Sequence, residues 1–239
     1  MVDNFEHIRQ LLRFDNEGDC YYVQLLRRAA DDPKPNGSPD PKYHGNMHSR
    51  SIKDYFIRSM NHLNDVEDEI KSLCTMFNVR AYIRLNRRSY KKIALQMLKH
   101  IAEQVSSGES FSSPHHLVSS AAGIVHNETS KTWIVDLDKE YLGYEGPIKS
   151  FICNCDPIRK KVQDTLDALS DITSYASLIE SYISKNIVVL PTKSGKHLIV
   201  QPFNVQQFSE QWAEFCTKFN ISLKQPDIHK DNPTILYVP

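Results

Sequence analysis

The strand predicted at Trp133–Asp138 constrains the fold of this chain more than any other stretch. Its sequence is Trp-Ile-Val-Asp-Leu-Asp, so apolar, mostly β-prone residues lead into two aspartates separated by one residue. Alternate side chains of a strand point to the same face, so we expect Asp136 and Asp138 to project together and Leu137 to point away from them. Adjacent carboxylates repel each other unless a proton or a cation lies between them. The pattern indicates either a site for Mg²⁺ or Mn²⁺, which prefer oxygen ligands, or a strand end with two solvated acids.

The overall composition excludes few classes of function. The 239 residues include 29 basic and 29 acidic side chains, so the net charge of zero neither demands nor excludes a nucleic-acid partner. The length suits one large domain or two small ones. No run approaches the roughly 18 apolar residues of a membrane span, and Met1–Arg13 lacks the pattern of a signal peptide. With five scattered cysteines, these features favour a soluble, cytoplasmic protein with reduced thiols and no membrane partner.

The first half of the chain alternates between helical and strand-like patterns. Apolar spacing predicts helices at Asn4–Phe14, Ser51–Phe77, Tyr90–Val105 and His115–Val125, strands at Cys20–Leu26 and Val79–Leu85, and a loop at Ala29–Arg50. Basic residues concentrate where the second of these strands turns into a helix that Ser89 can cap. They are Arg80, Arg84, Arg87, Arg88, Lys91 and Lys92. Because helix N-termini bind anions, this segment is a candidate for nucleic-acid contacts; the alternative is a solvated basic face.

The second half reads as strand, helix, hairpin, helix and strand. After Trp133–Asp138 the patterns predict a turn at Glu140–Pro147, a strand at Lys149–Cys155, a helical stretch at Asp156–Ile183, a hairpin of Ile187–Leu190 with His197–Phe203, a helix at Val205–Phe219 and a strand at Thr234–Val238. This order favours an α+β fold, with a mixed or antiparallel sheet covered by helices. We expect an N-terminal α/β module at 1–125 and a second module at 126–239, packed as one compact unit.

Two further segments carry candidate site residues. The hairpin turn combines two lysines, a hydroxyl, a glycine that lets the backbone approach a ligand, and a histidine at the start of a strand. These residues, which suit a phosphate although they form no P-loop, are Lys193, Ser194, Gly195, Lys196 and His197. Near the C-terminus, Asp227 or Asp231 could complete a metal site with Asp136 and Asp138.

This set of motifs resembles the archaeo-eukaryotic primase (primase-polymerase) superfamily. The pattern there is a strand ending in Asp-x-Asp, a later strand opened by small-x-His, and a hydrophobic residue followed by Asp near a third strand. Val135–Asp138 and Gly195–His197 match the first two elements. The third departs from the pattern, because Pro226 precedes Asp227 and Lys230 precedes Asp231. The resemblance covers about residues 132–237.

The resemblance implies an RRM-like primase catalytic core that joins nucleotides on a single-stranded nucleic-acid template. Asp136, Asp138 and one of Asp227 or Asp231 would hold Mg²⁺ or Mn²⁺, and these ions would activate a 3′-hydroxyl and stabilise the leaving pyrophosphate. His197 would contact the phosphates of the incoming nucleoside triphosphate, with Lys193, Ser194, Gly195 and Lys196 beside it. A helicase or another replication protein is an expected partner, in the cytoplasm of a microbe or of a virus-infected cell.

Two other functions fit parts of the same pattern. The chain could be a non-catalytic accessory protein of replication that keeps the primase fold and binds nucleic acid or nucleotides. Phosphatases of the haloacid dehalogenase type also begin with a strand ending in Asp-x-Asp, and Asp136 would then be the nucleophile and Asp138 the acid. That family usually has Thr or Val where this chain has Glu140, and its strand opens a parallel α/β fold near the N-terminus.

Overall fold

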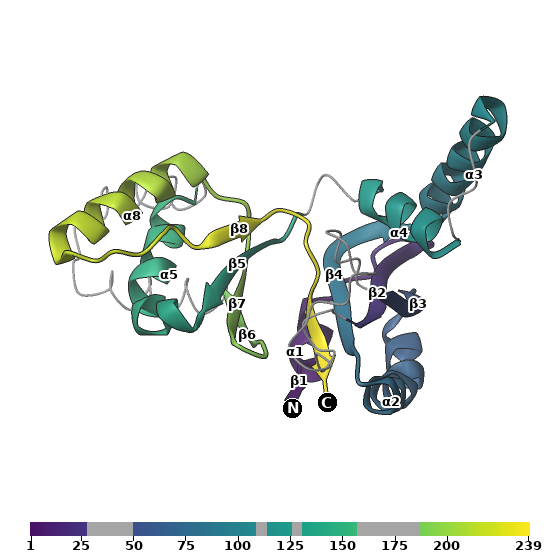
Figure 1. Cartoon of the computed structure of the whole chain (residues 1–239), viewed down its shortest axis with the longest axis horizontal. Coiled ribbons are helices and arrows are strands. Elements are labelled where there is room, and N and C mark those ends of the chain that lie inside the picture. Colours follow the sequence, from purple (N-terminus) through teal and green to yellow (C-terminus); the bar gives the residue numbers. More distant parts are fainter. Residues whose placement is uncertain (28–49, 109–113, 126–130, 157–186) are drawn as a thin grey trace, which may run out of the picture. The chain divides into compact units, whose positions relative to one another are not determined.

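The computed structural model describes residues 1–27, 50–108, 114–125, 131–156 and 187–239. The chain divides into two compact units (Figure 1). Unit 1 comprises Met1–Ser130 and Pro233–Pro239, and unit 2 comprises Lys131–Asn232. The chain therefore leaves unit 1 once and returns to it with its last strand. This division differs from the expected one at the C-terminus, where residues 233–239 belong to the first unit and not to the second.

Unit 1 is an antiparallel five-stranded sheet with helices. Its elements are β1 (Val2–Asp3), α1 (Phe5–Leu11), β2 (Asp19–Arg27), β3 (Arg50–Ile57), α2 (Met60–Phe77), β4 (Arg80–Ser89), α3 (Tyr90–Ser107), α4 (Pro114–Ile124) and β9 (Thr234–Val238). The strands are ordered β1-β9-β4-β2-β3, and every pairing is antiparallel. One end of the sheet packs against α3 and α4 through Cys20, Tyr22, Ile93, Ala121 and Ala122.

The C-terminal strand β9 belongs to unit 1 because it pairs with both β1 and β4. All five of its residues are buried. Asn4, which is itself fully buried, donates two hydrogen bonds to this strand. Its backbone N–H donates to the carbonyl oxygen of Leu236 at 3.0 Å, and its side-chain amide donates to that of Ile235 at 2.9 Å. These contacts satisfy backbone groups that burial would otherwise leave unpaired.

The helix predicted at Ser51–Phe77 is correct only from Met60 onward, since Arg50–Ile57 form strand β3. Asp54 explains the stability of this strand, because its carboxylate accepts hydrogen bonds from Tyr22 and Gln24 of the neighbouring β2. Helix α2 begins where Ser59 caps it, accepting from the N–H of His62 at 3.0 Å. Tertiary pairing therefore overrides the apolar spacing that favoured one long helix.

Unit 2 is a four-stranded antiparallel sheet with helices on one face. Its elements are β5 (Trp133–Asp138), the 3₁₀ helix η3 (Lys139–Tyr144), α5 (Glu145–Asn154), β6 (Val188–Pro191), β7 (Gly195–Val200), α8 (Val205–Phe219) and β8 (Asp227–His229). The strands are ordered β6-β7-β5-β8. Thus β7 lies between β5 and β6, and β5 lies between β7 and β8. Two strand–helix–strand segments are interleaved in one sheet.

The core of unit 2 lies between the sheet and the helices α5 and α8 (Figure 1). Val135 and Leu137 of β5 and Leu198 and Val200 of β7 face this core. The helices contribute Ile148, Ile152, Phe208 and Trp212. Because side chains alternate along a strand, Asp136, Asp138 and His197 lie on the opposite face of the sheet. The hydrophobic core therefore fixes which face carries the polar residues.

The other expectations have mixed outcomes. The helix at Val205–Phe219 and the strand at Thr234–Val238 are confirmed, and the hairpin is confirmed as β6 and β7. The strand predicted at Lys149–Cys155 is wrong, because the segment belongs to helix α5, which buries Ile148 and Ile152 one turn apart. Most of the helical stretch predicted at Asp156–Ile183 lies outside the described residues. Within the described residues, no helix is long and apolar enough to cross a membrane.

Candidate functional site

The candidate site is a row of polar side chains on the face of the unit 2 sheet that points away from α5 and α8. Asp136 of β5 pairs with His197 of β7 on one side and with Asp227 of β8 on the other. Directly paired residues of antiparallel strands have Cβ atoms about 4.5–5.5 Å apart and point to the same face. Asp138, two residues further along β5, lies on this face as well and pairs with Gly195. The register therefore gathers residues separated by about ninety positions of sequence into one patch.

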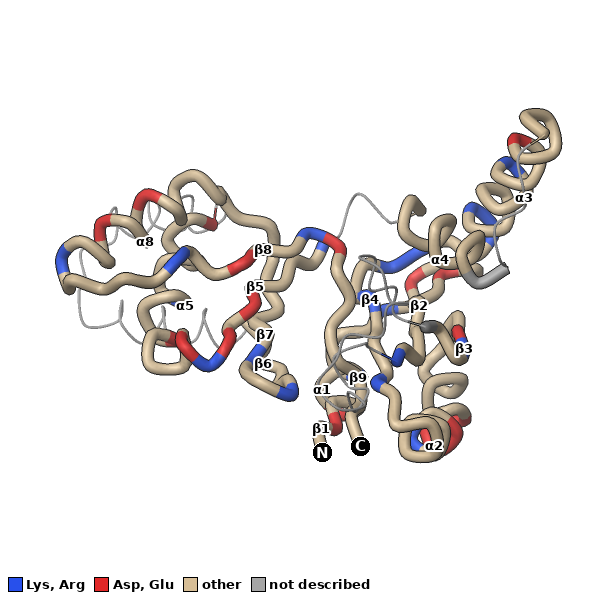
Figure 2. Tube along the Cα trace, in the orientation of Figure 1, with Lys and Arg blue, Asp and Glu red and all other residues tan. Residues whose placement is uncertain are grey.

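The charges of this patch are arranged unequally around Asp136. Figure 2 shows acidic positions on the neighbouring strands β5 and β8 and basic positions at the hairpin that joins β6 and β7. Asp138 and Asp227 are exposed, whereas the side chains of Asp136 and His197 are 34% and 13% exposed. His197 Nε2 lies 3.4 Å from Asp136 Oδ1, an ion pair when the ring is protonated. The central carboxylate thus has a partner on the β7 side.

Gly195 brings β7 close to the two aspartates. A Cβ atom placed on Gly195 would lie 3.0 Å from Asp138 Cα and closer still to the carbonyl oxygen of Leu137. No side chain fits there without moving the backbone. The turn before Gly195 is closed by two hydrogen bonds with Thr192, at 2.9 and 3.0 Å. The small residue of the small-x-His pattern thus has a steric reason in this chain.

Tyr141 and Glu145 follow β5 and were not singled out from the sequence. Burial raises the pKa of Tyr141 to about 12, and a hydrogen bond to Glu140 and the charges of Asp227 and Asp138 act in the same direction. This phenol therefore stays protonated near neutral pH. Hydrogen bonds from Lys149 first, and then from Lys196, lower the pKa of the Glu145 carboxyl. No sequence motif marked either residue, since their roles depend on what packs beside them.

Lys196 lies on the other face of the sheet from His197, contrary to its expected place beside the phosphates. It pairs with Leu137 across the strands, and its ammonium group donates to Glu145 Oε2 at 2.6 Å. Alternation along β7 gives the reason, because neighbouring residues of a strand point to opposite faces. Lys193 and Ser194, at the tip of the hairpin, are exposed.

The register also separates the two candidates for the third acid. Asp227 stands in β8 directly beside Asp136, whereas Asp231 lies in the bend that follows the strand. Three carboxylates offer the oxygen ligands that Mg²⁺ and Mn²⁺ accept, so the donor set of Asp136, Asp138 and Asp227 fits such an ion. In the part of the chain that the structure describes, no three His, Cys, Asp or Glu side chains already converge on one point.

The basic residues of unit 1 do not form one exposed patch. Arg88 is 1% exposed and donates to the carbonyl oxygens of Ala122 and Asn86. Arg87 is 8% exposed and pairs with Asp15 at 2.5 Å and Asp19 at 3.2 Å. Both residues lie within strand β4, where a turn was expected. Their contacts are within the chain, which leaves neither side chain available to nucleic acid.

The other members of the basic segment are more accessible. Arg80 and Arg84 are half-buried and share one face of β4. Across the sheet, Arg80 pairs with Leu26 of β2 and Arg84 pairs with Tyr22. Lys91 and Lys92 are exposed in the first turn of α3, and Ser89 caps this helix as expected, accepting from the N–H of Lys92 at 3.4 Å.

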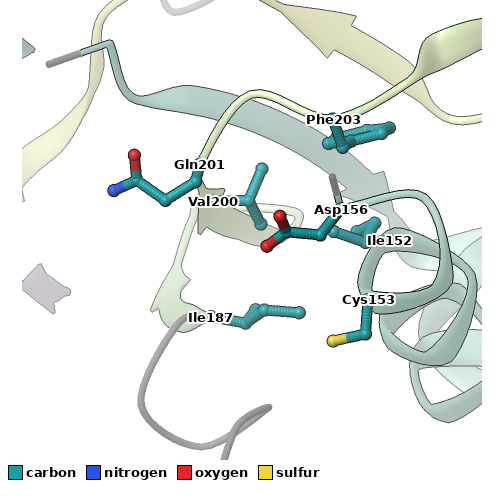
Figure 3. Close-up of a pocket in the computed structure, with 7 residues that line it drawn as sticks. All are labelled: Ile152, Cys153, Asp156, Ile187, Val200, Gln201 and Phe203. Atoms are coloured by element: carbon teal, nitrogen blue, oxygen red, sulfur yellow. The ribbon is translucent and has the colours of Figure 1, made fainter. Parts of the chain in front are cut away.

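A shallow hollow lies on the helix side of the unit 2 sheet, away from the acidic face (Figure 3). Its lining is mainly apolar: Ile152, Cys153, Asp156, Ile187, Val200, Gln201 and Phe203. Its volume of about 10 Å³ is room for about one water molecule. The hollow is therefore too small for a nucleotide, and the chemistry of unit 2 is better sought at the Asp136 face.

Comparisons of this chain with protein-family models, with curated proteins and with solved structures found no match.

Proposed function

We propose that this chain is a metal-dependent nucleotidyltransferase of the primase-polymerase type, which joins nucleotides on a single-stranded nucleic-acid template. The observation that carries the proposal is the row His197–Asp136–Asp227 across three adjacent strands, with Asp138 two residues from its centre. The three motifs that are scattered through the sequence meet on one face of one sheet.

The topology of unit 2 supports the same proposal. Its described strands and α-helices follow the order β-α-β-β-α-β, and the sheet order β6-β7-β5-β8 is that of RRM-like and ferredoxin-like domains. We therefore propose that unit 2 is an RRM-like catalytic core. A fold of this kind serves many functions, so the argument for the activity rests on the residues and not on the topology.

Each residue of the row has a proposed role. Asp136, Asp138 and Asp227 would hold one or two Mg²⁺ or Mn²⁺ ions, which would supply Lewis-acid activation of the attacking hydroxyl and charge stabilisation of the leaving group. His197 Nε2 turns from Asp136 to donate to the triphosphate of the incoming nucleotide. Lys193, exposed at the hairpin tip, adds positive charge on the same side. An unwinding partner such as a helicase would supply the single-stranded template.

The experiment is incorporation of labelled nucleotides on a primed single-stranded template with Mn²⁺ or Mg²⁺. Template-dependent product should appear with the wild type and disappear with Asp138→Ala and with Asp227→Asn. The matched variant Asp231→Asn should retain it, because Asp231 lies beyond β8. Equal losses of thermal stability and activity in the first two variants would mark those residues as structural. A folded wild type that binds single strands without incorporating nucleotides would favour the accessory-protein function.

The phosphatase alternative fits the fold less well. That family is built on a parallel sheet, whereas all pairings among the described strands are antiparallel. The same assay tests it, since a phosphatase would release phosphate from a nucleotide without extending the template-bound strand.

A further inference from the structure

His229 lies on the face that carries Asp136, although no sequence motif marked it. It occupies β8 two residues after Asp227 and pairs with Ile134, the residue two before Asp136. Two residues of a strand span about 6.8 Å, so the imidazole stands one step from the row of acids. Among the described strands of unit 2, β8 is an edge strand, with β5 as its neighbour. His197 and His229 therefore lie on opposite sides of Asp136.

A hydrogen bond with Asn232 orients the His229 ring. The side-chain amide Nδ2 of Asn232 lies 2.9 Å from His229 Nδ1. This contact engages Nδ1, so Nε2 is the ring nitrogen that remains to face a ligand. The side chain is partly exposed, and within the described residues its Nε2 has no hydrogen-bond partner. His229 thus presents an oriented ring nitrogen, Nε2, on the acidic face.

The geometry of phosphoryl transfer says what such a group could bind. The attacking and leaving oxygens stand roughly in line, on opposite sides of the phosphorus atom. In the proposed function the triphosphate lies on the β7 side, with His197 and Lys193. The acceptor strand, which brings the attacking hydroxyl, must then approach from the β8 side. In β8, the residue that follows Asp227 on this face of the sheet is His229.

We infer that His229 binds the acceptor strand, by donating from Nε2 to the phosphodiester nearest its 3′ end. This inference rests on the proposed function and adds a division of the site into a nucleotide side and an acceptor side. Asn232 is a positioning residue in this arrangement, because it holds the ring without reaching the ligand.

The test is steady-state incorporation by the full chain, with primed template and nucleotide varied in turn. His229→Ala should raise KM for the primed template about tenfold or more, the cost of one hydrogen bond to a charged group, and leave KM for the nucleotide within twofold. His229→Gln, which restores an amide N–H near the position of Nε2, should recover most of the affinity. Asn232→Ala should show a smaller loss in the same direction.

Binding of a fluorescently labelled primed template, followed by anisotropy without nucleotide, gives a second readout that needs no turnover. His229→Ala should weaken it by a similar factor, whereas His197→Ala should not. An equal effect of His229→Ala on both KM values, or none on either, would overturn the inference and leave the proposed function standing. A wild type that incorporates no nucleotide would overturn the proposed function and this inference with it. Unchanged thermal unfolding of His229→Gln shows that these readouts concern binding and not folding.

Discussion

Replacing Gly195 with alanine should destabilise unit 2, although it adds one methyl group. The new Cβ would meet Asp138 Cα and the carbonyl carbon of Leu137 at 3.0 Å, and the oxygen of Leu137 more closely still. Ordinary van der Waals contacts lie at 3.4–4 Å. The obstacle is the backbone where β5 ends beside the start of β7, so no flexible side chain can move aside. Strands β5 and β7 have to separate, and overpacking of this kind costs about 1–3 kcal/mol.

A matched control is available in the same unit. Gly146 lies in helix α5, and a Cβ placed there would meet nothing within 4 Å. Alanine is favoured over glycine in a helix by roughly 0.5–1 kcal/mol, so Gly146→Ala should be neutral or stabilising. The two variants make the same chemical change, but only Gly195→Ala should lower stability.

The assay is thermal or denaturant unfolding followed by tryptophan fluorescence. Trp133 and Trp212 are the two tryptophans of the chain, and both belong to unit 2, so their emission reports this unit. A loss of about 1–3 kcal/mol lowers Tm by roughly 5–20 °C in a domain of this size. If Gly195→Ala unfolds at the same temperature as Gly146→Ala, the close approach of β7 to β5 is refuted, and with it the steric reason for glycine before His197.

Two further predictions concern charged residues. Because its lysine partners lower the pKa of Glu145, its carboxylate stabilises the fold at pH values above its ordinary pKa of 4.5, and this contribution is lost as the pH falls through the lowered value. Glu145→Gln should therefore weaken the fall in unfolding free energy between about pH 5 and 3, by at most about 1 kcal/mol for these part-exposed groups. Arg88→Ala should destabilise unit 1 by about 2–4 kcal/mol, because it empties a buried site and leaves carbonyl oxygens without donors, whereas the exposed Lys92→Ala should be nearly neutral; circular dichroism during denaturant unfolding measures both.

Long periodic elements could be predicted from the sequence because their signals are local. Helix α8 begins after Asn204, which accepts from the N–H of Gln207, and it ends at Asn220 in the left-handed conformation. Both residue types are typical of helix ends. The apolar alternation of Trp133–Asp138 likewise depended on no other part of the chain. Such elements carry their boundaries in their own residues.

The failures share a different cause, which is pairing with distant segments. Residues 50–57 have an apolar spacing that suits a helix, but they form a strand because they pair with β2, where Asp54 also accepts two side-chain hydrogen bonds. Arg88 looked like a surface cation because its neighbours in the sequence are basic, yet its donors are satisfied by carbonyl oxygens inside unit 1. Three residues of β8 are too few for a periodic signal.

In the candidate site, too, local spacing was informative, whereas pairing with a distant strand could not be predicted. Gly195 and His197 are separated by two positions, as are Asp136 and Asp138. In an antiparallel pair, a glycine that must face Asp138 therefore brings His197 opposite Asp136, and a slip of one residue would send the histidine to the helix side. The place of His197 thus follows from the spacing once Gly195 is known to pair with Asp138. The strand that carries Asp227 and His229 follows helix α8 and the connection after it. Its register relative to β5 therefore cannot be predicted from residue spacing. The β8 side of the site, which selects Asp227 over Asp231 and adds His229, is therefore the part that required the structure.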